Sequence, residues 1–155
     1  MKRIGFIAMS GVRAHNAELT QLGLTLPGLV DRNEIIASLP SLGLLTLAGL
    51  TPDRFHVWYH EIADLKKLPE LPDDFDLVAL STFTAQFYEA CEVADYYRAK
   101  GIPVVMGGIT VSSLRDQARE HCTSVVIGEG ELLWPELLAD FERGDLKPFY
   151  VTNRE

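Results

Sequence analysis

Four short apolar runs, separated by stretches with helical periodicity, constrain the fold of this chain more than any other feature. The runs cover residues 4–8, 77–80, 102–106 and 125–127. They lack the polar alternation of a strand with one solvated face, a pattern typical of strands buried on both sides of a parallel sheet. Residues 55–60 alternate in part, which predicts an edge strand with one exposed face.

The intervening stretches carry helix boundary signals. Helices are expected over residues 40–50, 84–100, 113–121 and 133–144. Pro40 is expected to begin the first of them, and Ser113 with Asp116 resembles a capping box for the third. Pro135 is expected in the first turn of the last helix, where proline is tolerated, and Gly144 is expected to end it.

Strands that alternate with helices predict an α/β fold, because parallel neighbours need long right-handed crossovers. We expect a doubly wound five-stranded parallel sheet in the flavodoxin-like, Rossmann-like order 2-1-3-4-5. The 155 residues fit one domain, expected over residues 1–150, with a linker beginning at 151–155. The long connection over residues 10–39 is unusual for a compact domain unless it has a function, and Asp31 could open a short helix within it.

The composition limits the classes of partner that the chain is expected to bind. The net charge of −8 and the isoelectric point near 5.0 argue against nucleic acid and anionic membranes, which need clustered Lys and Arg. No apolar run approaches the roughly 18 residues of a membrane-spanning helix, so a cytoplasmic location is expected. Cys91 and Cys122 have no C-x-x-C spacing, so neither a disulfide framework nor a protein metal site is predicted.

Small and hydroxyl-bearing residues follow the predicted strands. In an open parallel sheet, ligands bind outside the carboxyl ends of the strands, near the point where strand order reverses. The candidate ligand-binding residues are Met9, Ser10, Gly11, Ser81, Thr82, Phe83, Thr84, Gly107, Gly108, Ile109, Thr110, Gly128, Glu129 and Gly130. Gly107 and Gly108 could let a large planar ligand touch the backbone, although glycines also simply make turns. The prediction of a ligand site rests on the occurrence of small and hydroxyl-bearing residues at four strand ends together.

Other polar residues invite chemical interpretations that are weaker. Glu129 and Glu131 could serve proton transfer, but acidic residues at the start of a helix are favoured by its dipole, and we prefer that role. His56 and His60 are expected on the surface of a strand, too far apart for an easy chelate, and His121 at a helix carboxyl end. No catalytic residue is predicted.

Four segments together resemble a known family. They are 39–48, with P-x-L-G-L-L-x-L-A, 76–81, 101–108, with G-x-P-V-V-x-G-G, and 125–131, which ends in G-E-G-E. In this order and spacing they are similar to the amino-terminal cobalamin-binding domain of many radical S-adenosylmethionine (SAM) proteins. The similarity covers nearly the whole chain.

The resemblance implies a corrin ring over the carboxyl edge of the sheet, with the nucleotide tail near the third and fourth strands. By position, Ser81, Thr82 and Thr84 would face the tail or the corrin amides. Gly107, Gly108 and Ile109 would line the passage of the tail, and residues 128–130 would close the far side. Cobalamin in this family relays a methyl group from SAM to a carbon or phosphorus centre, or assists a rearrangement.

The remaining cofactors would lie elsewhere. The C-x-x-x-C-x-x-C motif of a radical SAM cluster is absent, so SAM and a 4Fe-4S cluster are expected in a carboxyl-terminal domain of the same polypeptide, outside this chain. The D-x-H-x-x-G motif of other cobalamin proteins is also missing after the first strand: His15 is retained, but Arg13 replaces the aspartate. The resemblance implies base-off cobalamin, and the missing aspartate leads us to expect no histidine on cobalt.

The residues at the strand ends argue against other functions that this fold can have. A receiver domain would need an aspartate where Ser81 stands, and a flavodoxin or dinucleotide-binding domain would need a phosphate loop after the first strand. The alternative that stays open is a degenerate domain that binds no cofactor and serves as a docking module.

Overall fold

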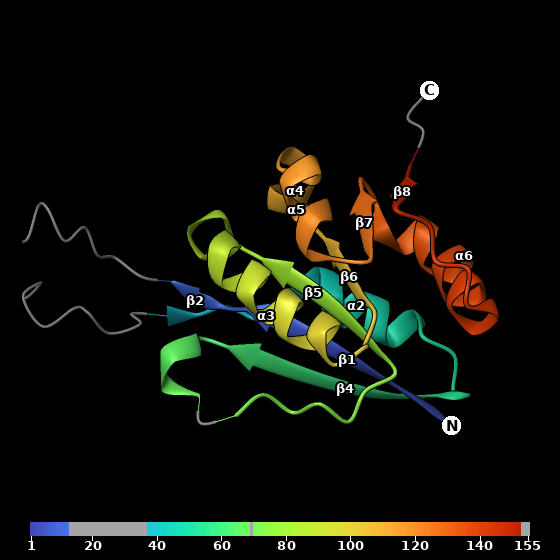
Figure 1. Ribbon diagram of the computed structural model, residues 1–155, viewed down its shortest axis with the longest axis horizontal. Helices are drawn as coiled ribbons and strands as arrows, with labels where there is room; N and C mark the ends of the chain where they lie inside the picture. Colours follow the sequence, from blue (N-terminus) through green and yellow to red (C-terminus); the bar gives the residue numbers. More distant parts are fainter. Residues whose placement is uncertain (13–36, 69, 153–155) are drawn as a thin grey trace, which may run out of the picture.

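The computed structural model describes residues 1–12, 37–68 and 70–152, and they form a six-stranded parallel sheet (Figure 1). Its strands are β1 (Lys2–Met9), β4 (Phe55–Ile62), β5 (Leu77–Thr82), β6 (Val104–Gly107), β7 (Ser124–Ile127) and β8 (Phe149–Val151). They lie in the order β4-β1-β5-β6-β7-β8, and every neighbouring pair is parallel. The first five follow the predicted order 2-1-3-4-5, so the doubly wound α/β fold is confirmed.

The expected number of five strands is wrong, because β8 adds a sixth beside β7. This strand has three residues, of which Tyr150 alone is buried, and it lies where the sequence predicts the end of the domain and the start of a linker. Its last residue, Val151, pairs with Ile127, and the amide of Thr152 donates a further hydrogen bond of 3.1 Å to the carbonyl of Ile127. Ordered contacts with the sheet thus continue into the segment expected to begin a linker.

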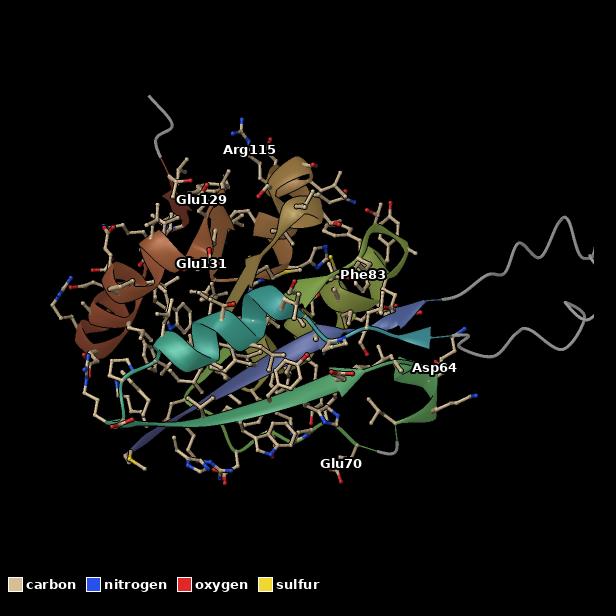
Figure 2. All side chains as sticks on the ribbon, turned by 180° about the vertical axis from the view of Figure 1, so that it is seen from behind. Asp64, Glu70, Phe83, Arg115, Glu129 and Glu131 are labelled. Carbon is tan, nitrogen blue, oxygen red and sulfur yellow. The ribbon has the colours of Figure 1, made fainter. Side chains whose placement is uncertain are left out.

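Helices cover both faces of the sheet. On one face lie α2 (Leu42–Leu50) and α6 (Gly130–Arg143), and on the other lie α3 (Phe87–Ala99), α4 (Ile109–Ser113) and α5 (Arg115–His121). Figure 1 shows α3 in front of the sheet, and the opposite view in Figure 2 shows α2 in front. Short 3-10 turns, η1 (Leu65–Lys67) and η2 (Thr84–Gln86), follow β4 and β5, and β2 (Gly11–Val12) pairs with β3 (Ala37–Ser38) as a separate antiparallel ribbon.

Two apolar cores result, one on each face of the sheet. Successive residues of a strand point to opposite faces, so Ile7 and Leu80 join the core beneath α3, whereas Phe6 and Ala79 join the core beneath α2 and α6. Trp134 of α6 packs on Phe6 with ring centroids 5.5 Å apart. The strands are therefore buried on both sides, as their apolar runs predict.

The helix boundaries differ from expectation in three places. The first helix begins at Leu42 with Ser41 as its cap, not at Pro40. The expected helix over residues 113–121 is divided into α4 and α5, and the predicted capping box is wrong, because the Ser113 hydroxyl donates to the carbonyl of Ile109 one turn back. Pro135 lies in the second turn of α6, since that helix already begins at Gly130.

Some expectations fall on residues that the structure does not describe. These are the short helix opened by Asp31 and the position of His15. Within the described ranges, no helix combines the length and the apolar character needed to cross a membrane.

A buried carboxylate fastens the end of the chain to α6. Asp140 is 3% exposed and accepts a 2.8 Å hydrogen bond from the hydroxyl of Tyr150 in β8. Arg143 pairs with the same carboxylate, and the Lys147 ammonium lies 3.4 Å from it. The bond from Tyr150, followed by the bond from Lys147, holds the pKa of Asp140 below its ordinary value of 3.8.

We therefore predict that Asp140→Asn lowers the melting temperature at neutral pH. Because the folded-state pKa of Asp140 lies below the unfolded value, its stabilising effect is complete above the unfolded pKa and is lost as the pH falls through the folded one. Thermal unfolding followed by circular dichroism between pH 7 and about pH 3 should show that the difference in melting temperature between the two proteins narrows at the acid end. Glu136→Gln, on the exposed side of α6, is the control and should change little. A gap that does not depend on pH would contradict the assignment.

Candidate functional site

A cavity of about 590 Å³ opens at the carboxyl edge of the sheet, over the ends of β5, β6 and β7. Its floor is the face of the sheet, formed by Ala79, Val105 and Val126. Leu47 of α2 and Trp134 of α6 form facing parts of its wall. The volume falls within the range of about 300–1,000 Å³ that is usual for small-molecule sites.

The structure brings half of the predicted binding residues to this one cavity. They are Ser81, Gly107, Gly108, Ile109, Gly128, Glu129 and Gly130. They come from three neighbouring strand ends, which is the arrangement expected of a ligand site in a doubly wound sheet. That they bind a ligand stays a prediction, but the geometry places them around a common space.

A smaller cavity of about 160 Å³ lies beside the first, between the end of β1 and the start of α2. Met9, Thr82 and Phe83 from the predicted set line it, and Ser81 lines both cavities. Figure 2 shows Phe83 on the same edge of the sheet as Glu129 and Glu131, with Phe83 at the end of β5 and the two carboxylates at the start of α6. The candidate site is thus an edge with two adjoining hollows.

Four predicted residues line neither cavity. Ser10, between β1 and β2, and Gly11, at the start of β2, are both buried, and a Cβ on Gly11 would overlap the carbonyl of Ala63. Gly11 therefore serves a close backbone approach. The hydroxyls of Thr84 and Thr110 lie 3.1 Å apart and bond to one another, so they tie η2 to α4.

The glycines at the strand ends make room for the cavity. Gly108 has φ +105° and ψ 176°, a region open essentially to glycine alone, and its Cβ would stand 3.2 Å from the hydroxyl oxygen of Ser81. A Cβ on Gly107 would touch the Val126 side chain at 3.4 Å, and one on Gly130 would meet Leu47 at 3.7 Å. Larger residues at these positions would crowd the space between strand and helix.

The lining is apolar below and polar at the rim. Hydroxyls of Ser81, Ser112 and Ser113 and the carboxylates of Glu129 and Glu131 are the polar side chains among its residues, and no lysine, arginine or histidine lines either cavity within the described ranges. Such a site suits a flat, largely uncharged group held by hydroxyls and backbone amides.

The sequence did not reveal the helical half of the cavity. Gly43, Leu44 and Leu47 of α2, Ser112 of α4 and Trp134 of α6 line it without having been predicted as site residues. A signal was available in α2, whose sequence LGLLTLAGL is apolar on every side although Leu44 alone is fully buried. An apolar helix without a polar face normally has something packed on both sides.

The two cysteines and the three histidines that the structure describes do not line the cavity. Burial raises the pKa of both the Cys91 and the Cys122 thiols to about 11, which keeps them protonated and unreactive. His60 is half-buried and stacked on Trp58 with ring centroids 5.0 Å apart, rather than fully on the surface, and His121 ends α5 and bonds Asp95 at 2.8 Å. Across the described residues, no three side chains suited to a metal ion gather in one place.

The chain is a doubly wound α/β domain with a cavity at the carboxyl edge of its sheet. The chain is similar to bacteriochlorophyllide d C-12(1)-methyltransferase of Chlorobaculum tepidum, with 34% identity over 125 residues, which is 81% of this chain and 27% of that protein. It is also similar to the C-8(2)-methyltransferase of the same organism, with 34% identity over 112 residues, 71% of this chain and 24% of that protein. The chain thus spans about a quarter of the length of these curated relatives. No family model matches it, and no solved structure matches it significantly.

The backbone of Gly108 generates a prediction for stability. Replacing Gly108 by alanine should cost about 1–3 kcal/mol, because a Cβ is strained in this conformation. Gly43→Ala is the matched control: it lies in α2, no atom stands within 4 Å of its Cβ position, and it should leave stability unchanged or raise it. Urea unfolding measures both, and equal stability of the two variants would contradict the glycine-only conformation at residue 108.

Proposed function

We propose that this chain is a cobalamin-binding domain of a radical SAM methyltransferase or a related enzyme. The observation that carries the proposal is the cavity over β5, β6 and β7, apolar at its floor and lined by glycine at the ends of β6 and β7. The two relatives are methyltransferases by name, and the matching region covers most of this chain. The sequence resemblance to cobalamin-binding domains indicates cobalamin as the cofactor.

The cavity suits one part of cobalamin in particular. The nucleotide tail ends in benzimidazole, a flat, neutral and mostly apolar ring system that would lie against Ala79, Val105 and Trp134. The amide side chains of the corrin would meet the hydroxyls of Ser81 and Thr82 and the backbone at the rim. The absence of a cation among the described lining residues disfavours the doubly charged phosphate of a flavin mononucleotide more than the singly charged phosphodiester of cobalamin.

The residues of this chain would hold and orient the cofactor. Gly107 and Gly108 would let it approach the ends of the strands, while Leu47 and Trp134 exclude water from the tail. When bound, cobalamin supplies a cobalt centre that accepts and passes on a methyl group. In this proposal SAM and a 4Fe-4S cluster belong to a carboxyl-terminal radical SAM domain of the same polypeptide, and the whole enzyme is cytoplasmic.

We further propose that cobalamin binds base-off and without a protein imidazole on cobalt. The benzimidazole cannot fill the cavity and also reach the metal. Of the histidines that the structure describes, His56 and His60 lie on β4 and His121 ends α5, and none lines either cavity. His15 lies outside the described residues, and the loss of the aspartate two residues before it argues against a ligand role.

Electron paramagnetic resonance of the cob(II)alamin form tests this binding mode. We expect a spectrum without superhyperfine splitting from an axial nitrogen, because neither benzimidazole nor histidine reaches the cobalt. A triplet splitting in the bound form would contradict the proposal. Free cob(II)alamin at neutral pH, in which benzimidazole is coordinated, provides the reference spectrum for the split form.

A docking module without cofactor is the second candidate. It is favoured by apolar side chains that α2 and α4 leave exposed, namely Leu42 at 74%, Leu50 at 52% and Ile109 at 89%. Ile109 lines the larger cavity and Leu42 the smaller one, so a partner that covered these two residues would also cover the cofactor. The two candidates therefore differ in one property, which is whether the chain retains cobalamin.

Retention of hydroxocobalamin, after incubation and desalting, tests the proposed function. We expect the wild-type chain to keep the corrin absorbance and Gly43→Leu to lose it, with affinity at least about tenfold weaker. Gly43 lies one helical turn from Leu47 on the wall of the cavity, so the added side chain would occupy ligand space. If the added side chain displaces an apolar part of the ligand, the hydrophobic contact that is lost is worth roughly 1.5–3 kcal/mol. This is enough for an affinity about tenfold weaker.

Gly49→Leu is the matched control. Gly49 lies in the same helix, its Cβ position is equally open, and it does not line the cavity. Both changes remove a helical glycine and should not destabilise the fold. Equal binding by the two variants would place the ligand elsewhere, and a folded wild-type chain that retains no corrin would favour the docking module.

A further inference from the structure

The strand β8 ends directly behind the loop that closes the cavity. The amide of Thr152 donates to the carbonyl of Ile127 at 3.1 Å, and its hydroxyl lies 3.4 Å from the same carbonyl. The hydroxyl oxygen also accepts a 3.2 Å hydrogen bond from the amide of Glu129. Gly128 has φ +92°, and a Cβ there would overlap the hydroxyl of Thr152, so loop and hydroxyl are in close contact.

This contact falls on the wall of the cavity. Gly128, Glu129 and Gly130 are three consecutive lining residues, and they join β7 to α6. Glu129 is the cap position of α6, but its own side chain makes no capping bond. Thr152 thus provides a side-chain acceptor for a backbone amide at a helix start, where amides have no partner within the helix.

The strand that precedes Thr152, β8, is itself anchored to α6. Tyr150 bonds the buried carboxylate of Asp140 at 2.8 Å, and the Tyr150 hydroxyl also accepts from the amide of Lys147 at 3.2 Å. The second half of α6 is therefore contacted by Tyr150 of β8, and its start by Thr152, the residue that follows β8. A shift of β8 along β7 would move the acceptor away from Glu129.

We propose that Thr152 is a positioning residue of the ligand site. Its hydroxyl holds residues 128–130 in the conformation that lines the cavity, and β8 thereby couples the position of the chain end to ligand affinity. The identity of the ligand rests on the proposed function. The positioning itself rests on the hydrogen bonds of Thr152 and on the close contact at Gly128.

The test compares variants of the whole chain by two measurements, hydroxocobalamin affinity in equilibrium dialysis and amide hydrogen exchange at Glu129 without ligand. Thr152→Val keeps the shape of the side chain but removes the acceptor. We expect about fivefold weaker binding and about fivefold faster exchange, the effect of one lost hydrogen bond. Thr152→Ser retains the hydroxyl and should restore both values.

A matched control lies at the opposite edge of the sheet. The Thr123 hydroxyl accepts from the amide of Val104 at 3.1 Å, next to the start of β6 and away from both cavities. Thr123→Val removes the same kind of bond and should leave affinity and Glu129 exchange unchanged. Thr152→Ala replaces Thr152→Val in the comparison if the valine variant does not fold.

The outcomes separate the two proposals. If the wild-type chain binds hydroxocobalamin and Thr152→Val binds equally well, the positioning role is overturned and the proposed function stands. Equal weakening in Thr152→Ser would also overturn it, because the hydroxyl would not be the cause. If the wild-type chain does not bind, the proposed function fails and the positioning role fails with it, whatever the exchange rates.

Discussion

The need to cover both faces of a parallel sheet governs this structure. On one face α2 and α6 meet this need along most of the strands, where Phe6 and Trp134 pack together. The spacing of the two helices is fixed by Thr51 at the end of α2, whose hydroxyl accepts a 2.9 Å bond from the Trp134 indole. Toward the carboxyl edge the facing residues are small, with Gly43 on α2 and Gly130 on α6, and the space between the helices remains open as the cavity.

The fold could be predicted from the sequence because its central strands are continuous apolar runs. Residues 4–8, 77–80, 102–106 and 125–127 are apolar throughout, and buried parallel strands require no more than that. β8 was not predicted, because its three residues have only one buried side chain and no helical pattern follows them. It is held instead by contacts with residues distant in sequence, such as the pairing of Val151 with Ile127.

The part of the candidate site at the strand ends could be predicted for a similar reason. Strand ends converge on one edge in any doubly wound sheet, so Ser81, Gly108 and Gly128 could be placed together from their positions in the chain. The contribution of Leu47 and Trp134 could not, because it depends on how two helices pack and not on where they occur in sequence. Ser10 and Thr110 had suitable chemistry at suitable places, yet the first is buried and the second bonds to Thr84.

The chain thus has an open cavity with an apolar floor and a polar rim, and the central claim is that cobalamin occupies the cavity. Glycine amides test it most directly, since they resonate in a distinct region of a proton–nitrogen correlation spectrum. Addition of diamagnetic hydroxocobalamin should shift the signals of Gly43, Gly107, Gly108, Gly128 and Gly130, which line the cavity. The signals of Gly5, Gly101 and Gly144, which do not, should stay in place. Shifts confined to the second group, or no shifts at saturating ligand, would contradict the account.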